Sequence, residues 1–285
     1  MDAPWLGLLG ILVICLAVTE AMWTAALLDG GGPVTSALSA GLWRLGLRLA
    51  ERGRRQFLVI TGSLILLLVI LVWFLLLWLG WTLLFLADSQ AVLHAADGKP
   101  ADFTAVVYFA GFTITTLGVG DYVPGTALFQ LLAPIAAGSG FFLISLFVAY
   151  LLTVFGSVLD QRRLATQIAF LGPNPTEVLR RAWNGSDYSR LEEQLITIAR
   201  DLFGVGHRYH AYPGLRHFAA MHRHSAIGLQ VAVLDEVLTL IGCGLRRDKN
   251  PLPPAVLQAR EAIELFIENV KAGTVAETPP SPPLS

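Results

Sequence analysis

A short stretch between two long apolar runs has the composition of an ion-coordinating loop. It reads Thr115-Thr116-Leu117-Gly118-Val119-Gly120-Asp121, so that two glycines alternate with apolar residues before an aspartate. Glycine adopts positive φ without steric cost, and Gly118 and Gly120 therefore allow successive peptide units to turn their carbonyls the same way. A row of such carbonyls can replace the water shell of a monovalent cation. The hydroxyl of Thr116 can add one more oxygen at the inner end.

This loop resembles the selectivity filter of potassium channels, whose signature is Thr-Val-Gly-Tyr/Phe-Gly-Asp. Four positions match that signature: Thr116, Gly118, Gly120 and Asp121. Leu117 is a small departure and Val119 is a larger one. The resemblance implies a filter over residues 116–121. It places K⁺ on the backbone carbonyls of four residues, namely Thr116, Leu117, Gly118 and Val119. It also implies a homotetramer, because each subunit supplies one loop.

The segment before the loop is typical of a re-entrant pore helix. Residues 102–115 are rich in aromatic side chains, and Asp102 can cap their first turn. A helix of this length, about 20 Å, cannot cross ~30 Å of hydrocarbon. Its negative C-terminal end would favour a cation beside it. The resemblance implies that four residues support the filter: Tyr108, Phe109, Phe112 and Thr115. The alternative is a glycine turn that joins two spans in another kind of membrane protein.

Departures from the family pattern leave two further functions open. Val119 replaces an aromatic residue that, in the family, packs on the pore helix and holds the filter at width. Phe112 stands where some members have a buried acid, and Phe109 cannot donate a hydrogen bond, although Tyr108 can still reach Asp121. One alternative is therefore a weakly selective monovalent cation channel. The other is a membrane sensor or scaffold with a vestigial pore.

The composition divides the chain into a membrane half and a water-soluble half. Of the 285 residues, 54% are hydrophobic and 14% charged, against ~45–50% and ~25% in soluble domains. Residues 1–159 carry 14 of the 41 charged residues, and residues 160–285 carry 27. We therefore predict an all-α membrane protein with the tetrameric potassium-channel pore fold and an α-helical cytoplasmic domain. The balanced charge predicts no nucleic-acid partner. No nucleophile–base pattern is present, so we expect no enzyme activity and no cofactor besides permeant K⁺.

Five consecutive segments are predicted along the chain. They are an N-terminal span at 1–32, an amphipathic interfacial helix at 33–56, a pore domain at 57–159, a helical cytoplasmic domain at 160–272 and a disordered tail at 273–285. The pore domain divides into an outer helix at 57–87, the pore helix at 102–115, the filter at 116–121 and an inner helix at 126–158. Trp73, Trp78 and Trp81 are expected to form an aromatic belt. Glu20 in the first span is either a functional ionisable group or a residue near the interface.

The distribution of basic residues predicts the orientation of the spans. The loop 29–56 is rich in arginine, and Arg162 and Arg163 follow the third span, whereas residues 88–102 hold a single lysine. Basic loops stay in the cytoplasm. We therefore expect a three-span protein of the plasma membrane, in contact with lipid, with its N-terminus outside and its C-terminus in the cytoplasm. A prokaryotic inner membrane is the expected location.

Two features of the inner helix follow from the resemblance. Gly138 and Gly140 stand where the family commonly has a hinge. Four apolar residues share one face at helical spacing and would line the inner cavity and gate: Phe141, Ile144, Val148 and Leu152. Packing against lipid or a neighbouring helix is the alternative for each of them.

The water-soluble half is predicted to be helical throughout, and its ligand is not evident. The expected helices cover residues 175–183, after an Asn174 cap, 186–203, 215–241 and 254–271, with a loop at 204–214. Five histidines gather in the middle of this half: His207, His210, His217, His222 and His224. They are candidates for a metal or pH-sensing site, and a packed or solvated surface is the alternative. Cys15 and Cys243 lie in different halves and are not expected to pair.

Overall fold

The computed structural model describes residues 3–26, 31–51, 56–245 and 253–272. These residues form two compact units. The first unit contains residues 3–26, 31–40 and 64–152 of the described chain, and the second contains the remainder. The predicted tail at 273–285 lies outside the described residues.

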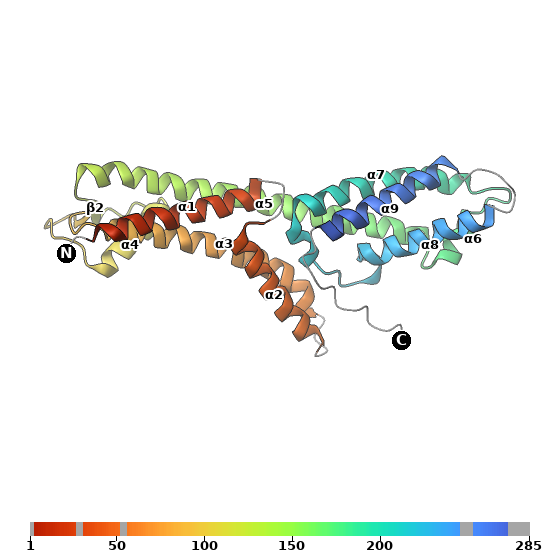
Figure 1. Cartoon of the computed structure of the whole chain (residues 1–285), viewed down its shortest axis with the longest axis horizontal. Helices are drawn as coiled ribbons and strands as arrows, with labels where there is room; N and C mark the ends of the chain where they lie inside the picture. Colours follow the sequence, from red (N-terminus) through yellow and green to blue (C-terminus); the bar gives the residue numbers. More distant parts are fainter. Residues whose placement is uncertain (1–2, 27–30, 52–55, 246–252, 273–285) are drawn as a thin grey trace. The chain divides into compact units, whose positions relative to one another are not determined.

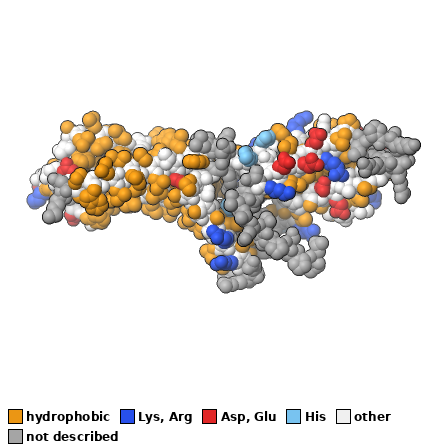
Figure 2. Space-filling model, viewed as in Figure 1, with side chains coloured by type: hydrophobic (Ala, Val, Ile, Leu, Met, Phe, Trp, Pro, Cys, Tyr) orange, Lys and Arg blue, Asp and Glu red, His pale blue; other side chains and the backbone are white. Residues whose placement is uncertain are grey.

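The first unit is built from apolar helices. It contains α1 (Pro4–Ala26), the start of α2 (Pro33–Glu51), most of α3 (Gln56–Phe85), α4 (Phe103–Ile114) and the first part of α5 (Ala127–Leu171) (Figure 1). Among the described residues, α1, α3 and α5 are long and apolar enough to cross a membrane. Figure 2 shows hydrophobic side chains over most of the visible surface of this unit. The prediction of a multi-pass membrane protein is thus confirmed.

Helix α1 packs closely on α3 through glycines. A Cβ atom at Gly10 would lie 2.7 Å from the Gly80 carbonyl oxygen, and one at Gly80 would lie 2.7 Å from Ile14 Cγ1. Small residues of this kind let the backbones of membrane helices approach each other. The N-terminal span is therefore an integral part of the first unit.

Tryptophans of α3 hold the two helices that flank the loop. Trp78 Nε1 donates to the Val107 carbonyl of α4 at 2.9 Å, and Trp81 Nε1 donates to Ser139 Oγ of α5 at 2.9 Å. Trp73 and Trp81 are buried. The predicted aromatic belt is wrong for these two residues, because their indoles pack between helices and their N–H groups find partners there.

Two short strands pair with each other next to the C-terminal end of the loop, one from before α4 and one from directly after the loop. Strand β1 (Val92–His94) pairs antiparallel with β2 (Tyr122–Pro124), and His94 lies opposite Tyr122. The sequence predicted no strand here, because three-residue strands are too short for an alternating pattern.

Helix α5 continues beyond the predicted end of the inner helix at residue 158 and reaches Leu171. The prediction was wrong because it ended the helix with the apolar run. Leu164, Ala165 and Ile168 maintain helical spacing after that run and are buried in the second unit. Pro134 lies inside α5 without dividing it.

The second unit combines the C-terminal part of α5 with a set of further helices. It contains α6 (Pro175–Ala182), α7 (Ser189–Ala211), α8 (Ile227–Leu245) and α9 (Pro254–Ala272), with 3₁₀ turns η1 (Pro213–His217) and η2 (Arg223–Ser225). Helices α7 and α9 lie along each other (Figure 1). Asn174 Oδ1 accepts from the Glu177 N–H at 2.9 Å, which confirms the predicted cap of α6.

Two predicted boundaries in this unit are wrong. Helix α7 runs through the expected loop at 204–214 as far as Ala211, because Val205 and Tyr209 continue its buried face. The expected helix at 215–241 begins only at Ile227. The segment before it is rich in arginine and histidine and lacks a repeating apolar face, so it forms 3₁₀ turns instead.

Candidate functional site: the loop between α4 and α5

The backbone of the loop alternates between positive and negative φ. The φ angles of Thr116, Gly118 and Gly120 are 58°, 59° and 87°, while Leu117 and Val119 are outside the positive region. Such alternation turns successive peptide planes so that their carbonyls can share one side. In the described part of the chain, no backbone N–H donates to the carbonyl oxygens of residues 116–120. The residues predicted to coordinate K⁺ are thus together in one loop with unoccupied acceptors.

The inner end of the loop is fixed to the C-terminus of α4. The N–H of Thr116 donates to the Thr113 carbonyl at 3.0 Å, and the N–H of Leu117 donates to the Phe112 carbonyl at 2.9 Å. The hydroxyl of Thr115 bonds back to the Gly111 carbonyl at 2.9 Å. The negative end of the α4 dipole therefore lies directly at the start of the carbonyl row, where it favours a cation. The predicted Asp102 cap is confirmed at the other end of α4, since Asp102 Oδ1 accepts from the Ala105 N–H at 2.8 Å.

The outer end of the loop is held by the two-stranded ladder. The Asp121 carbonyl accepts from the Ala95 N–H at 2.8 Å, and Asp121 Oδ1 accepts from the Tyr122 N–H at 3.1 Å. Tyr108 lies near Asp121, and its ring meets that of Tyr122 with ring centroids 6.2 Å apart. Asp121 thus joins the loop to Ala95 and β2, and both ends of the carbonyl row are anchored.

Aromatic rings of α3 and α4 form one cluster. Phe109 is buried and meets Phe85 edge to face with ring centroids 5.0 Å apart. Phe112 lies 5.2 Å from Phe109 and 5.1 Å from Tyr108. Three predicted support residues therefore belong to one cluster. Sequence reasoning missed Phe85, because only the packing of α3 against α4 brings it to these rings.

The apolar residues of the loop and of α5 are open in a single chain. Leu117 and Val119 are exposed, and so are all four residues predicted to line the inner cavity, namely Phe141, Ile144, Val148 and Leu152. Apolar surface of this extent on a membrane helix contacts lipid or another subunit. This face is therefore open to lipid or to a neighbouring subunit, as both sequence interpretations require.

The two glycines proposed as a hinge have different surroundings. Helix α5 is continuous at both Gly138 and Gly140. A Cβ atom at Gly140 would collide with the carbonyl oxygen of Ile114 and would lie 2.7 Å from its carbonyl carbon, whereas one at Gly138 would meet nothing within 4 Å. Gly140 is therefore the place where α5 touches the end of the pore helix, and close packing explains it without a hinge.

Glu20 caps the N-terminus of α2 from within α1. Its buried carboxylate accepts from the Val34 N–H at 3.0 Å and from the Thr35 N–H at 3.3 Å. Thr35 Oγ1 in turn accepts from Trp73 Nε1 at 3.2 Å. A negative group at a helix N-terminus satisfies free N–H donors and complements the helix dipole. The structure thus assigns Glu20 a structural part that neither sequence interpretation included.

Glu20→Ala is expected to lower the stability of the protein by about 1–3 kcal/mol, because one part-buried and one buried N–H donor of α2 lose their acceptor. Glu20→Gln keeps one acceptor oxygen and should lose less. Thermal unfolding of the purified protein in detergent measures both effects. Thr19→Ala is the matched control, since the Thr19 hydroxyl bonds only to carbonyls of its own helix. Equal melting temperatures for Glu20→Ala and the wild type would contradict the capping assignment.

The five candidate histidines do not converge on one site. His207 packs on Phe203 at 4.3 Å, and the rings of His222 and His224 stack at 5.3 Å. Burial, and to a lesser degree the charge of Arg216, lowers the pKa of His217 to about 4. Among the residues that the structure describes, no three His, Cys, Asp or Glu side chains lie together in a group able to hold a metal. These surroundings favour the packed-surface interpretation.

Comparison with known proteins supports the assignment of the loop to a channel. Residues 64–157 match the Ion_trans_2 family, described as ion channel, and this range includes most of α3, all of α4, the loop and the first part of α5. The uncharacterized membrane protein YdjJ of Bacillus subtilis (strain 168) is 31% identical over 281 residues, which cover 97% of this chain and 82% of YdjJ. No solved structure matches. The chain therefore belongs to the family of YdjJ, and it is a multi-pass membrane protein with an ion channel domain.

Proposed function

We propose that the protein is a potassium-selective channel in which four copies of the loop 116–121 surround one ion path. The observation that supports this most directly is the alternation of φ at Thr116, Gly118 and Gly120, with carbonyls that accept no hydrogen bond in the described chain. Carbonyl oxygens at fixed positions replace the hydration shell of K⁺. Anchorage at α4 and at the β1–β2 ladder holds them in place.

A single chain supplies only one side of such a path. The loop and the α5 face with Phe141 and Leu152 are exposed in the isolated subunit. Rotational symmetry about a common axis would bring equivalent loops together and cover part of this apolar surface. A homotetramer is therefore part of the proposal. By the distribution of arginines, we propose that residues 160–272 lie in the cytoplasm.

Selectivity is proposed to depend on backbone geometry rather than on the side chain of residue 119. The rings of Tyr108, Phe109 and Phe112 form one cluster on α4, to which the start of the loop is hydrogen-bonded. Val119 is half exposed and adds no aromatic packing. That exposure favours, as a second candidate, a channel that conducts monovalent cations with weak preference.

We expect the wild-type protein in liposomes to pass K⁺ in preference to Na⁺, and Val119→Tyr to keep or sharpen this preference. A ring at position 119 would add packing next to the pore helix, as in the family that the loop resembles. Reversal potentials under a K⁺/Na⁺ gradient measure the preference directly. Val123→Tyr in β2 is the control, because it adds the same ring outside the filter. A wild-type reversal potential of zero with equal total cation on both sides would reject potassium selectivity and leave the weakly selective channel.

A further inference from the structure

The second unit contains a large cavity that channel conduction does not explain. Its volume is about 960 Å³, and it lies between the end of α5, α6 and the start of α7. Ligand pockets in proteins have volumes of ~300–1,000 Å³. Buried apolar side chains, including Val178, Leu191 and Ile198, form part of its lining. The cavity therefore has the volume and the partly apolar lining of a site for an organic ligand.

Arginines dominate the charged lining of this cavity. Four of them contribute to it: Arg162 and Arg163 from α5, Arg181 from α6 and Arg190 from α7. Glu193 is the single acidic residue of the lining. In the described chain, the guanidinium groups of Arg162, Arg163 and Arg190 make no ion pair or hydrogen bond. The positive charges of these three guanidinium groups repel one another, because no ion pair neutralises them. The arrangement therefore favours an anion between them.

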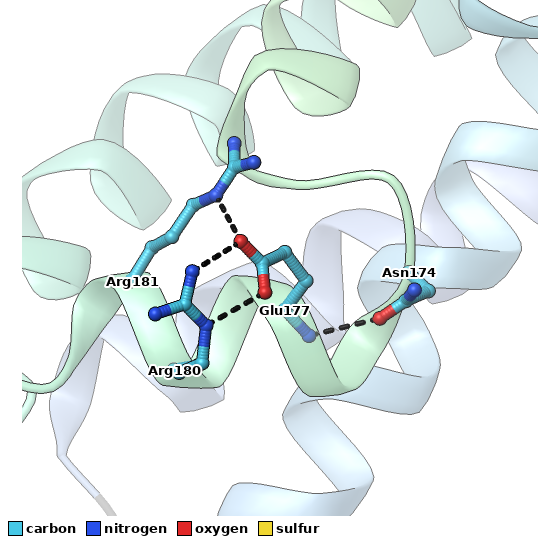
Figure 3. Close-up of polar contacts among 4 residues, drawn as sticks. All are labelled: Asn174, Glu177, Arg180 and Arg181. Atoms are coloured by element: carbon cyan, nitrogen blue, oxygen red, sulfur yellow. Dashed lines mark hydrogen bonds and ion pairs between the residues drawn. The ribbon is translucent and has the colours of Figure 1, made fainter.

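Arg181 is held at the cavity by a neighbouring carboxylate. Glu177 Oε1 accepts from Arg181 Nε at 2.7 Å and from Arg180 Nη2 at 2.7 Å, while Arg180 Nε donates to Oε2 at 2.8 Å. The two guanidinium groups lower the pKa of Glu177 to about 2. Figure 3 shows the terminal nitrogens of Arg181 pointing away from the carboxylate that binds its Nε. Arg181 is thus oriented while its remaining donors stay available.

These features identify the chemistry of the occupant. Guanidinium groups bind phosphate oxygens in bidentate fashion. Four arginines are more than a single phosphate group requires. The exposed ring of Phe170 also lines the cavity, beside Leu171, and offers a surface for an aromatic group. We propose that this cavity binds a nucleotide-type polyphosphate, with its phosphates on the arginines and its base near Phe170. The headgroup of an anionic lipid shares the phosphate chemistry and is the competing source.

The position of the arginines on α5 suggests how the ligand acts. Arg162 and Arg163 belong to the same continuous helix as the residues proposed to line the ion path. A ligand that draws them toward α6 and α7 would bias the position of α5, and binding would then change K⁺ flux. This consequence for flux rests on the proposed function, whereas binding itself does not.

Binding is tested on the full-length protein in detergent with a fluorescent ATP analogue, which unlabelled ATP and inorganic pyrophosphate are expected to displace. The double variant Arg162→Gln/Arg190→Gln should weaken ATP binding at least ~10-fold, given the strength of charge-assisted hydrogen bonds. Arg200→Gln is the matched control, because Arg200 lies on α7 together with Arg190 but does not line the cavity. It should bind ATP as the wild type does. Circular dichroism and gel filtration verify that each variant is folded.

A second arm of the experiment separates the two sources of phosphate. The protein is placed in nanodiscs of phosphatidylcholine alone or with phosphatidylglycerol. Competition of phosphatidylglycerol with the ATP analogue, together with failure of free ATP and pyrophosphate to displace it, would assign the cavity to lipid and overturn the nucleotide proposal. Absence of saturable binding by the folded wild type, or equal loss in Arg200→Gln and the double variant, would also overturn it. ATP binding without any change of K⁺ flux would reject only the link to gating.

Discussion

Gly118→Ala is expected to abolish K⁺ flux while the protein still folds and assembles. Gly118 has a φ of 59°, and a Cβ atom there would meet nothing within 4 Å. The effect therefore comes from the backbone and not from a collision. An L-residue in this region costs roughly 1–2 kcal/mol, and Thr116 at 58° already carries such strain in the same loop. Repeated in four subunits, the cost reaches ~4–8 kcal/mol, enough to turn the carbonyls away from the ion.

The matched control for this variant is Gly185→Ala in the connection between α6 and α7. Gly185 also has positive φ, 106°, with open space around it, so the substitution introduces similar strain away from the loop. K⁺ flux from liposomes, measured with a potassium-sensitive electrode, should be lost for Gly118→Ala and retained for Gly185→Ala. Full flux through Gly118→Ala would remove residues 116–121 as the filter.

Gly140→Ala is expected to eliminate conduction for a different reason. The new methyl group would collide with the carbonyl of Ile114 at the end of α4. Overpacking costs ~1–3 kcal/mol per site, and here the atoms that must move are backbone atoms one residue before Thr115. Displacement of α4 would carry the first residues of the carbonyl row with it. We therefore expect loss of K⁺ flux at an unchanged level of folded protein.

Gly138→Ala separates this explanation from a hinge. Gly138 is on the same helix with nothing within 4 Å of a Cβ atom, and alanine is favoured over glycine in helices by roughly 0.5–1 kcal/mol. If packing decides, Gly138→Ala conducts normally and Gly140→Ala does not. If a hinge at these glycines opened the channel, both variants would lose open probability in single-channel recordings.

The sequence was sufficient for the elements whose signals are local. Asp102 and Asn174 were recognised as caps because a short polar side chain before an apolar helix has few other uses, and both accept the expected N–H. Long apolar runs predicted the three candidate spans. The alternation of glycine with other residues predicted the loop, since glycine is the residue type that adopts positive φ without steric cost.

Features that depend on tertiary contact could not be predicted. Nothing local distinguishes Trp81, whose N–H bonds to Ser139, from a tryptophan of the lipid interface. From the sequence, Gly140 is interpreted as a hinge. Only the packed structure shows that the carbonyl of Ile114 leaves no room for a side chain at this position. The arginine-lined cavity also depends on tertiary packing and could not be predicted, because its residues come from three helices separated in sequence.

The capping of α2 by Glu20 has a consequence for biogenesis. A carboxylate within an apolar segment opposes insertion by the translocon, at a cost of about 3 kcal/mol at the centre of a span and less toward its end, where Glu20 lies. The first donors able to compensate it, the N–H groups of Val34 and Thr35, are synthesised only after α1 is complete. Stable integration of α1 is therefore expected to depend on the arrival of the first turn of α2 at the membrane during translation.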